Sequence, residues 1–491
     1  MTPASNPSSP RRRRQGTRAS PARRLAHKVL LRVQREDAYA ERVLDTLLAR
    51  AELDPRERAF TTELVYGTLR HQALLDFYLA RLATKPLRKL PPDVLVALEL
   101  GAYQLLYTRV PAHSAVNESV ALAAETRRSL RGVANGIMRA LERQQQTGAL
   151  PSPNAAFQDP LRALAVATNH PQWLLQELAA AWKWEDVVAF ATANNAPPPL
   201  CLRVNPRRAT AGRVAAALGD HGVSVWRPEA PLASALPQAL ATRAGGSVRD
   251  WPGFGEGEFS VQDFGAQLVG ELTADAVHTS GAAHILDVCA APGGKTTQLA
   301  EALDGAQRVL AVDVHPGRVR LIDSGVARLG LDAAVQTAAV DATNAQGLRQ
   351  LVRDATARAC VGTVLLDAPC SGLGTLRRHP ELRHRSAASI DALVALQDQL
   401  LDVAAALCAP GGRLVYAVCT VTRAEGPERV RSFLARHPEF ECAAPTAAAL
   451  QPFLTPLDSG RALQVWPHRH GTDGFFAVTL RKCGESSPEA I

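Results

Sequence analysis

Two cysteines stand where a thiol could act on a bound substrate. Cys370 lies in the segment LLDAPCSGLG, and Cys419 lies in the segment GGRLVYAVCT. Each follows an apolar run that is typical of a buried parallel strand. Open α/β sheets bind their ligands beyond the carboxyl ends of the strands. We therefore expect both thiols to lie in one crevice at that edge of a sheet.

A glycine-rich segment, DVCAAPGGKTT, lies upstream of both cysteines. It is typical of a strand, a tight turn and the start of a helix, whose free N–H groups can bind a ligand. It is not a phosphate-binding P-loop, because no four-residue gap precedes the pair Gly294-Lys295. Asp313 ends the next predicted strand about 20 residues further on, where an acid typically binds ribose hydroxyls. These features predict a site for a nucleotide-type cofactor.

Two further aspartates follow predicted strands. Asp341 lies past another apolar segment and could reach an adenine amino group, although its place also suits an ordinary helix N-cap. Asp367 lies three residues before Cys370. A carboxyl group at that place could hydrogen-bond to a pyrimidine ring nitrogen or protonate it.

Two thiols beside a nucleotide-type cofactor point to methylation of a pyrimidine carbon. Carbon 5 of cytosine is a poor nucleophile, but a thiolate that adds to carbon 6 makes carbon 5 enamine-like and able to attack a sulfonium methyl group. A proton must then leave carbon 5, and the thiol must be expelled. The addition needs a cysteine that its surroundings activate. A cysteine can instead be a small buried apolar residue, which is our interpretation of Cys201, Cys360, Cys408, Cys442 and Cys483.

The elements that must position these residues alternate between strand and helix from about residue 256 onward. Predicted strands cover residues 284–288, 308–312, 363–366, 413–417 and 474–480. Helical segments separate most of them, which favours a parallel, doubly wound sheet.

The first half of the chain has a different pattern. Residues 22–145 show apolar residues at helical spacing throughout and predict an all-α domain, with Asp54-Pro55 as a helix start. A linker is predicted over 144–154, and a small α/β module over 155–255 includes a strand that ends in a basic turn. Residues 1–21 are predicted to be a disordered basic tail, which either contacts nucleic acid or is only solvated.

The composition limits the class of protein. A net charge of +8 fits a polyanionic partner, and most of the 55 basic residues are arginines, which bind phosphate bidentately, although a compositional bias explains that skew equally well. Eight cysteines in 491 residues without a CxxC pair predict neither a disulfide framework nor a metal site. No apolar run approaches about 18 residues, and no secretory signal opens the chain. These features predict a cytoplasmic protein.

The motifs together resemble those of the RNA cytosine-5 methyltransferases of the Nop/Sun type. The likeness rests on DVCAAPGGKTT, DAPCSGLGTLRRHPELR, YAVCT, GTDGFF and VQDFGAQ. In the helical part, LVYGTLR and ALELGAYQLLY resemble the NusB-type RNA-binding domain of the bacterial Sun/Fmu subgroup. The resemblance covers roughly residues 22–480. It implies a Rossmann-like class I methyltransferase domain over 256–483 behind an all-α NusB-like domain and a small α/β module.

The resemblance also implies roles for single residues. Cys419 matches the family's nucleophile, and Cys370 matches the cysteine that assists product release, with Asp367 beside them. The pocket for S-adenosyl-L-methionine is then lined by Cys289, Ala290, Ala291, Pro292, Gly293, Gly294, Lys295, Asp313, Asp341 and Asp367.

The chain departs from the family pattern at two places. Val418-Cys419-Thr420 replaces the usual Thr-Cys-Ser, so that a hydroxyl group before the nucleophile is lost. After Pro380, Arg383-His384 replaces the usual Lys-Trp pair. The same loop keeps a basic cluster, which we interpret as part of the site beside Cys370 rather than a solvated charge run: Arg377, Arg378, His379, Arg383 and Arg385.

The function that the resemblance implies is methylation of cytosine carbon 5 in small-subunit (16S) ribosomal RNA, read as an unpaired base. The helical domain and the turn with Arg203, Arg207 and Arg208 are expected to position the RNA backbone. Transfer RNA or another ribosomal position is an alternative substrate, and a catalytically idle RNA-binding assembly or antitermination factor is an alternative class. Nothing in the sequence indicates a membrane or an obligate protein partner.

Overall fold

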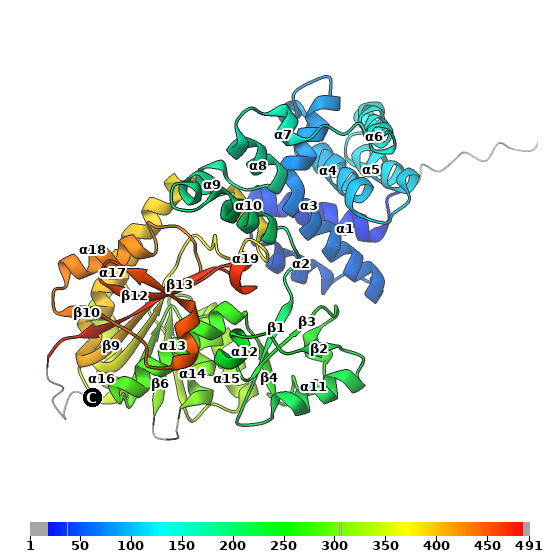
Figure 1. Ribbon diagram of the computed structural model, residues 1–491. Coiled ribbons are helices and arrows are strands. Elements are labelled where there is room, and N and C mark those ends of the chain that lie inside the picture. The colour runs from blue at the N-terminus through cyan, green and yellow to red at the C-terminus, as the bar shows by residue number, and fades with distance from the viewer. Residues whose placement is uncertain (1–17, 37, 304, 306, 485–491) are drawn as a thin grey trace, which may run out of the picture. The chain divides into compact units, whose positions relative to one another are not determined.

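The structure is a computed structural model that describes residues 18–36, 38–303, 305 and 307–484. The chain divides after Asn169 into two compact units (Figure 1). The predicted tail over 1–21, with its arginines 11–14, lies mostly outside the described residues. The domain limits predicted at 145, 155 and 255 stay predictions, but the first compact unit continues past residue 145.

The first unit is helical throughout its described residues, as its sequence periodicity predicts. Its helices are α1 (Pro21–Glu36), α2 (Ala40–Leu48), α3 (Pro55–Leu82), α4 (Pro92–Tyr107), α5 (Ala112–Thr126), α6 (Arg131–Gln146), α7 (Pro153–Ala156) and α8 (Pro160–Thr168). The predicted start of α3 is confirmed, because the Asp54 side chain accepts the N–H of Glu57 at 2.9 Å. Helix α4 is buried on most of its faces, so the core of the unit forms around it.

One buried carboxyl group lies in this helical core. Glu99 of α4 is 1% exposed, and Gln72 donates a hydrogen bond to its Oε1 atom at 3.2 Å. Burial, and then the charge of the neighbouring Asp76, raises the pKa of Glu99 above its ordinary value. The neutral acid is therefore the form that suits the folded unit.

Glu99→Gln is expected to make the first unit less sensitive to alkaline pH. Because the folded-state pKa is raised, the stability that the neutral acid contributes is complete below the ordinary glutamate pKa and is lost as pH rises through the folded value. The loss is about 1.4 kcal/mol for each pH unit that separates the two values. Hydrogen exchange of α4 amides between pH 5 and 9 measures it, with exposed Glu52→Gln as the control. Equal pH slopes in the wild type and Glu99→Gln would contradict this account.

The main sheet of the second unit has nine strands among the described residues. Eight follow the order β11-β12-β13-β9-β8-β5-β6-β7, and β10 pairs with β13. The strands are β5 (His284–Val288), β6 (Arg308–Asp313), β7 (Val335–Ala339), β8 (Val361–Asp367), β9 (Cys408–Val418), β10 (Phe440–Ala443), β11 (Leu454–Leu457), β12 (Gly460–Val465) and β13 (Phe475–Lys482).

Parallel pairing holds for β7, β6, β5, β8 and β9, which include four of the five predicted strands. The fifth prediction is wrong in direction, because β13 runs antiparallel to β9, with Val478 opposite Tyr416. The chain between β9 and β13 forms β10 and the β11–β12 hairpin and therefore enters β13 from the opposite end.

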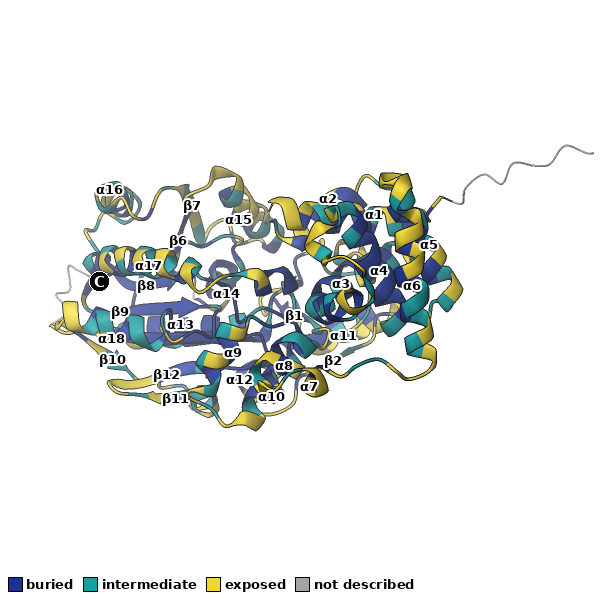
Figure 2. Ribbon diagram, turned by 90° about the horizontal axis from the view of Figure 1, so that it is seen from above, coloured by how far each residue is buried: buried dark blue, intermediate teal, exposed yellow. Residues whose placement is uncertain are grey.

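Helices cover both faces of this sheet (Figure 1). They are α13 (Phe264–Ser280), α14 (Gly294–Ala302), α15 (Pro316–Leu329), α16 (Ala345–Thr356), α17 (Ala388–Leu407) and α18 (Pro427–Arg436), with the short α19 (Pro467–His470) before β13. Neighbouring side chains of one strand enter opposite cores: Ile285 packs in the α13–α15 layer and Leu286 in the α16–α18 layer. The central strands are accordingly buried along their length (Figure 2).

A second, smaller sheet precedes the main one in the same unit. Its strands are β1 (Leu200–Val204), β2 (Val225–Trp226), β3 (Ala239–Thr242) and β4 (Phe259–Val261), in the order β2-β3-β1-β4. Helices α9 (Gln172–Ala179), α10 (Trp184–Ala193), α11 (Ala211–Asp220) and α12 (Leu232–Ala235) accompany it. The predicted mixed α/β module and its strand near residue 200 are confirmed.

Of the three arginines predicted to position RNA, Arg203 lies inside β1 and is buried, whereas Arg207 and Arg208 lie in the turn after it. Arg203 is 4% exposed, and its guanidinium donates to both carboxylate oxygens of Glu301, at 2.8 and 2.9 Å. The prediction that Arg203 contacts RNA is therefore wrong. Arg207 donates to the Glu301 carbonyl at 2.9 Å, and Arg208 donates to the Leu329 carbonyl at 3.0 Å. Both stabilise C-terminal ends of helices and remain exposed, so an RNA contact of Arg207 and Arg208 stays a prediction.

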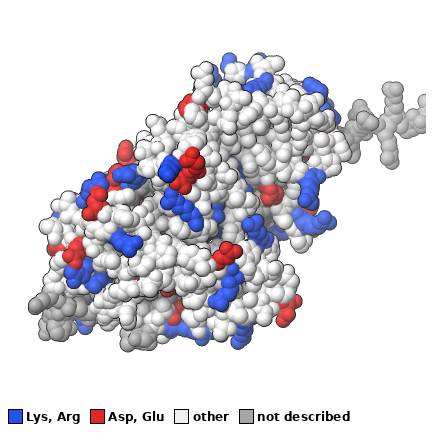
Figure 3. Space-filling view, in the orientation of Figure 1, with Lys and Arg blue, Asp and Glu red and all other residues white. Residues whose placement is uncertain are grey.

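Charge alone does not locate a nucleic-acid surface. On the face drawn in Figure 3, Lys and Arg side chains are scattered over both units, and Asp and Glu side chains lie among them. Among the described residues, no helix is both long and apolar enough to cross a membrane.

Candidate active site

The structure brings the two singled-out cysteines into contact. Cys370 follows the end of β8 by three residues, and Cys419 directly follows β9, the strand that pairs with β8. Their Sγ atoms lie 3.4 Å apart. The Gly374 N–H donates to the Cys419 carbonyl at 3.0 Å, so the backbones of the two cysteine loops are also joined. The two thiols therefore meet at the carboxyl ends of neighbouring parallel strands, the edge of the sheet at which they were predicted.

The two thiols have different surroundings. The hydrogen bond between the two thiols, then burial, and then the charges of Cys419 and Glu425 raise the pKa of Cys370 well above its ordinary value. Cys370 is therefore held as a neutral thiol that can donate a hydrogen bond or a proton.

An ion pair between Lys295 and Asp367 stands beside the thiols. The Lys295 Nζ atom donates to Asp367 Oδ2 at 2.7 Å and lies 5.2 Å from the centre of the Phe475 ring. Burial alone would lower the pKa of Lys295, but Asp367, followed by Cys419 and Asp287, raises it. Lys295 therefore stays charged close to Cys419, and Asp367 is engaged as a carboxylate acceptor.

The glycine turn has the shape that the sequence predicts. Gly293 has a φ of +100°, which a side chain would strain, and α14 begins at the next residue. The Ala291 N–H donates to Asp313 Oδ2 at 3.3 Å, which ties the turn to the end of β6. Below the turn, Thr296 donates to Asp287 at 2.6 Å, and burial raises the pKa of Asp287 to about 7.

The two outer aspartates differ in environment. Asp313 is buried, accepts the N–H of His315 at 3.2 Å, and pairs with Arg318 at 3.5 Å. Asp341 is exposed and accepts the N–H and hydroxyl of Thr343 at 2.9 and 2.7 Å. The N-cap alternative for Asp341 is wrong, because Asn344 caps α16.

Three arginines of the basic cluster after Cys370 form an internal network, so this part of the cluster is not a solvated charge run. Arg378 donates to Asp263 and to Asp473, each at 2.8 Å, and these acids belong to the VQDFGAQ and GTDGFF motifs. Arg377 and Arg383 are buried, and Arg383 donates to the Asn194 carbonyl at 2.8 Å.

The motifs are fastened to one another by backbone as well. The Gly474 N–H donates to the Gly374 carbonyl at 2.7 Å, and a Cβ atom at Gly374 would collide with the Gly474 carbonyl. Glycine is required at this crossing because the two chains approach too closely for a side chain. The Cys370 loop, the Cys419 loop and the start of β13 thus form one rigid group.

Sequence reasoning missed one buried residue of this group. Glu425 lies between β9 and α18 and is 0% exposed. Its carboxylate accepts hydrogen bonds from both cysteine loops, through Ser371 and Thr420. The only signal in the sequence is the hydroxyl-rich stretch after Cys419.

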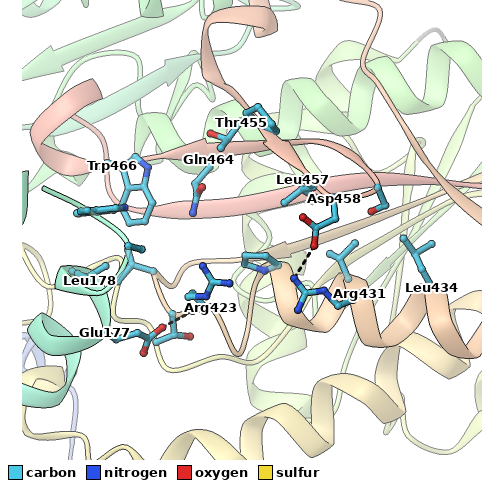
Figure 4. Close-up of a pocket in the computed structure, with 18 residues that line it drawn as sticks. Glu177, Leu178, Arg423, Arg431, Leu434, Thr455, Leu457, Asp458, Gln464 and Trp466 are labelled. Atoms are coloured by element: carbon cyan, nitrogen blue, oxygen red, sulfur yellow. Dashed lines mark hydrogen bonds and ion pairs between the residues drawn. The ribbon is translucent and has the colours of Figure 1, made fainter.

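A separate cleft of about 340 Å³ lies on the outer side of the Cys419 loop. Its walls come from α9, the loop at 421–423, α18, β11 and β12, and Trp466 and Gln464 face into it (Figure 4). Glu177 of α9 accepts the N–H of Arg423 at 2.7 Å there. The cleft backs the cysteine loop but does not contain the thiols.

Models of three protein families match the chain in order. The NusB family matches residues 20–143, the ferredoxin-like domain of RsmF/B-like methyltransferases matches 170–242, and the 16S rRNA methyltransferase RsmB/F family matches 276–481.

Curated relatives match almost the whole chain. It is 35% identical to a probable ribosomal RNA small subunit methyltransferase B from Synechocystis over 94% of this chain and 99% of that protein. It is 32% identical to the probable ribosomal RNA small subunit methyltransferase B of Bacillus subtilis, with the same coverage. The ribosomal RNA small subunit methyltransferase B of Pseudomonas putida is 36% identical over 88% of this chain and 92% of that protein.

Solved structures agree on the fold. PH0851 superposes with a TM-score of 0.75 at 24% identity, over 94% of this chain and 99% of that one. NSun6 from Pyrococcus horikoshii, determined with SFG, superposes with a TM-score of 0.53 at 19% identity, over 64% of this chain and 98% of that one.

Proposed function

Because the chain belongs to the 16S rRNA methyltransferase RsmB/F family, we propose that it methylates carbon 5 of a cytosine in small-subunit ribosomal RNA through a covalent bond to Cys419. Its cofactor is S-adenosylmethionine. The observation that carries the proposal is the 3.4 Å contact between two thiols at the ends of neighbouring strands. The charged Lys295 and the Asp367 carboxylate stand beside them.

The residues around the glycine turn fit S-adenosylmethionine. The Asp313 carboxylate is suited to the ribose hydroxyls, and the first N–H groups of α14 are suited to the methionine carboxylate. The turn from Cys289 to Lys295 gives the backbone close access, and Asp341 lies beyond the end of β7 for the adenine. When bound, the cofactor supplies an electrophilic methyl group to carbon 5.

The protein side chains handle the base and the protons. The Cys419 thiolate adds to carbon 6 and makes carbon 5 nucleophilic. Asp367 accepts a hydrogen bond from the base in this proposal, and its carboxylate is held by Lys295. After carbon 5 loses its proton to water, the neutral Cys370 thiol can give a proton to the departing sulfur of Cys419, and water returns a proton to Cys370. This assignment keeps the nucleophile and the proton donor on different thiols.

The helical unit is also expected to bind the RNA. The NusB-like match in the helical unit supports a backbone-binding role for that unit, with affinity that falls as salt rises. The exposed base must leave its stack to reach thiols at a sheet edge.

Asp313→Ala is expected to weaken S-adenosylmethionine binding by about 1–3 kcal/mol, because a hydrogen-bonded charged acceptor for the ribose is lost. Isothermal titration calorimetry measures it, with Asp323→Ala, an exposed aspartate on α15, as a control. Unchanged affinity would remove Asp313 from the cofactor site.

Methyl transfer to unmodified 16S ribosomal RNA tests the proposed function. One portion of the RNA is digested to nucleosides after the reaction, and 5-methylcytidine is identified by mass spectrometry. A second, undigested portion is mapped by bisulfite sequencing. A methyl group on another atom or another base would overturn the carbon-5 assignment. Methylation of transfer RNA in place of ribosomal RNA would overturn the substrate.

A further inference from the structure

A single buried carboxylate collects hydrogen bonds from both cysteine loops. Glu425 Oε1 accepts the Ser371 N–H at 2.7 Å and Gln397 Nε2 at 3.2 Å. Its Oε2 accepts the hydroxyls of Ser371 at 2.6 Å, Thr422 at 2.8 Å and Thr420 at 3.0 Å. Every one of these partner groups is a hydrogen-bond donor. Such a set suits a carboxylate, because a carboxylate only accepts hydrogen bonds.

The donors are the immediate neighbours of the two thiols. Ser371 follows Cys370 directly, Thr420 follows Cys419 directly, and their hydroxyl oxygens lie 2.7 Å apart. Any movement of one cysteine loop away from the other would therefore break hydrogen bonds to a group that has no access to water.

Glu425 is itself fixed in place. The Tyr416 hydroxyl donates to the Glu425 carbonyl at 2.6 Å, and Gln397 also donates to the Pro369 carbonyl at 2.9 Å. On the outer side of the same turn, Glu177 accepts the Arg423 N–H (Figure 4). A group held from several elements can transmit its position to the residues that it binds.

We propose that Glu425 is a positioning residue, which holds the Cys370 and Cys419 loops together so that their Sγ atoms stay in contact. The proposal rests on the proposed function for its catalytic consequence but not for its geometry. The Glu425 charge also adds, after the Cys419 hydrogen bond and burial, to the causes that raise the pKa of Cys370. The same carboxylate thus favours the thiol form of Cys370.

The geometric part is tested without RNA by phenylarsine oxide, which bridges two neighbouring thiols through two As–S bonds and releases one water molecule. At pH 6 the wild type is expected to bind it across Cys370 and Cys419, with Cys419→Ala as the baseline. Glu425→Gln replaces one of the two acceptor oxygens with an NH2 group. This variant is expected to bind phenylarsine oxide about tenfold to a hundredfold more weakly than the wild type. Peptide mass spectrometry distinguishes Cys370 from Cys360, which lies in the same tryptic peptide.

The catalytic part is tested by steady-state methyl transfer. Glu425→Gln is expected to lower kcat by about a hundredfold, the scale of a small misplacement of reacting groups, and to leave KM for RNA unchanged. Asp398→Asn is the matched control, because it removes a carboxylate from α17 that binds Arg429 and touches neither cysteine loop. It should leave both the arsenical affinity and kcat unchanged.

The outcomes separate the two proposals. Unchanged arsenical affinity in Glu425→Gln overturns the positioning role, whatever the methyl-transfer result. A weakened bridge together with a wild type that does not methylate cytosine leaves the positioning role standing and overturns the proposed function. If Glu425→Gln does not fold, Thr422→Val removes one donor at nearly constant shape, and a wild-type arsenical affinity in that variant overturns the positioning role.

Discussion

Cys419→Ala is expected to lower the rate of methyl transfer by a factor on the order of 10⁴ or more. This is the scale seen when an activated nucleophile is removed. The physical reason is that carbon 5 of cytosine gains nucleophilic character only after a thiolate has added to carbon 6. Alanine offers no sulfur for that addition. The variant should also form no covalent complex with RNA, as measured by denaturing electrophoresis with labelled RNA.

Folding and cofactor binding serve as controls for this variant. Cys419 is only partly buried and lies at the end of β9, so a small side chain leaves the sheet intact. S-adenosylmethionine affinity by calorimetry should match that of the wild type. Methyl transfer above a thousandth of the wild-type rate would show that Cys419 is not the attacking group.

The positions of the strand-end residues were predictable because buried parallel strands leave a plain signal. The apolar runs before Asp367 and Cys419 define β8 and β9, and the glycine turn before α14 defines the cofactor side. The apolar runs do not predict the order of the strands in the sheet. The 3.4 Å contact between Cys370 and Cys419 exists because β8 and β9 are neighbours, which only the folded sheet decides.

The periodicity of apolar residues also does not show whether a strand runs parallel or antiparallel to its neighbour. The antiparallel direction of β13 was therefore not predictable from it. The short strands β10 and β11 escaped prediction for a related reason. Each has four residues, and Pro456 in β11 is tolerated because β11 lies at the edge of the sheet. A proline within a run argues against a strand when only the sequence is considered.

Buried charges were the main failure of prediction at the site. Arg203, Arg377 and Glu425 stand in segments that are typical of exposed basic turns or loops, yet each is buried among partners distant in the sequence. Ion pairing and multiple hydrogen bonds make such burial tolerable. Because the partners belong to other motifs, the composition of a segment does not reveal whether its charges face solvent or a partner.

Cys370→Ala should behave differently from Cys419→Ala. Attack by Cys419 and methyl transfer can both proceed without the second thiol, whereas release of Cys419 from carbon 6 loses its proton donor. The 3.4 Å distance and the raised pKa of Cys370 support that role, since a neutral thiol in contact with the departing sulfur can supply the proton. Turnover is expected to fall by about 10²- to 10⁴-fold, the usual contribution of general acid–base catalysis.

The distinctive sign of Cys370→Ala is an enzyme–RNA adduct that survives denaturing electrophoresis. The adduct should carry the transferred methyl group, because the block comes after methylation, and radiolabel from the cofactor should therefore migrate with the protein–RNA band. The double variant with Cys419→Ala should show no such band, since adduct formation requires the Cys419 sulfur. An adduct that instead appears in Cys419→Ala and disappears in Cys370→Ala would reverse the two roles and assign the attack on carbon 6 to the Pro-Cys thiol.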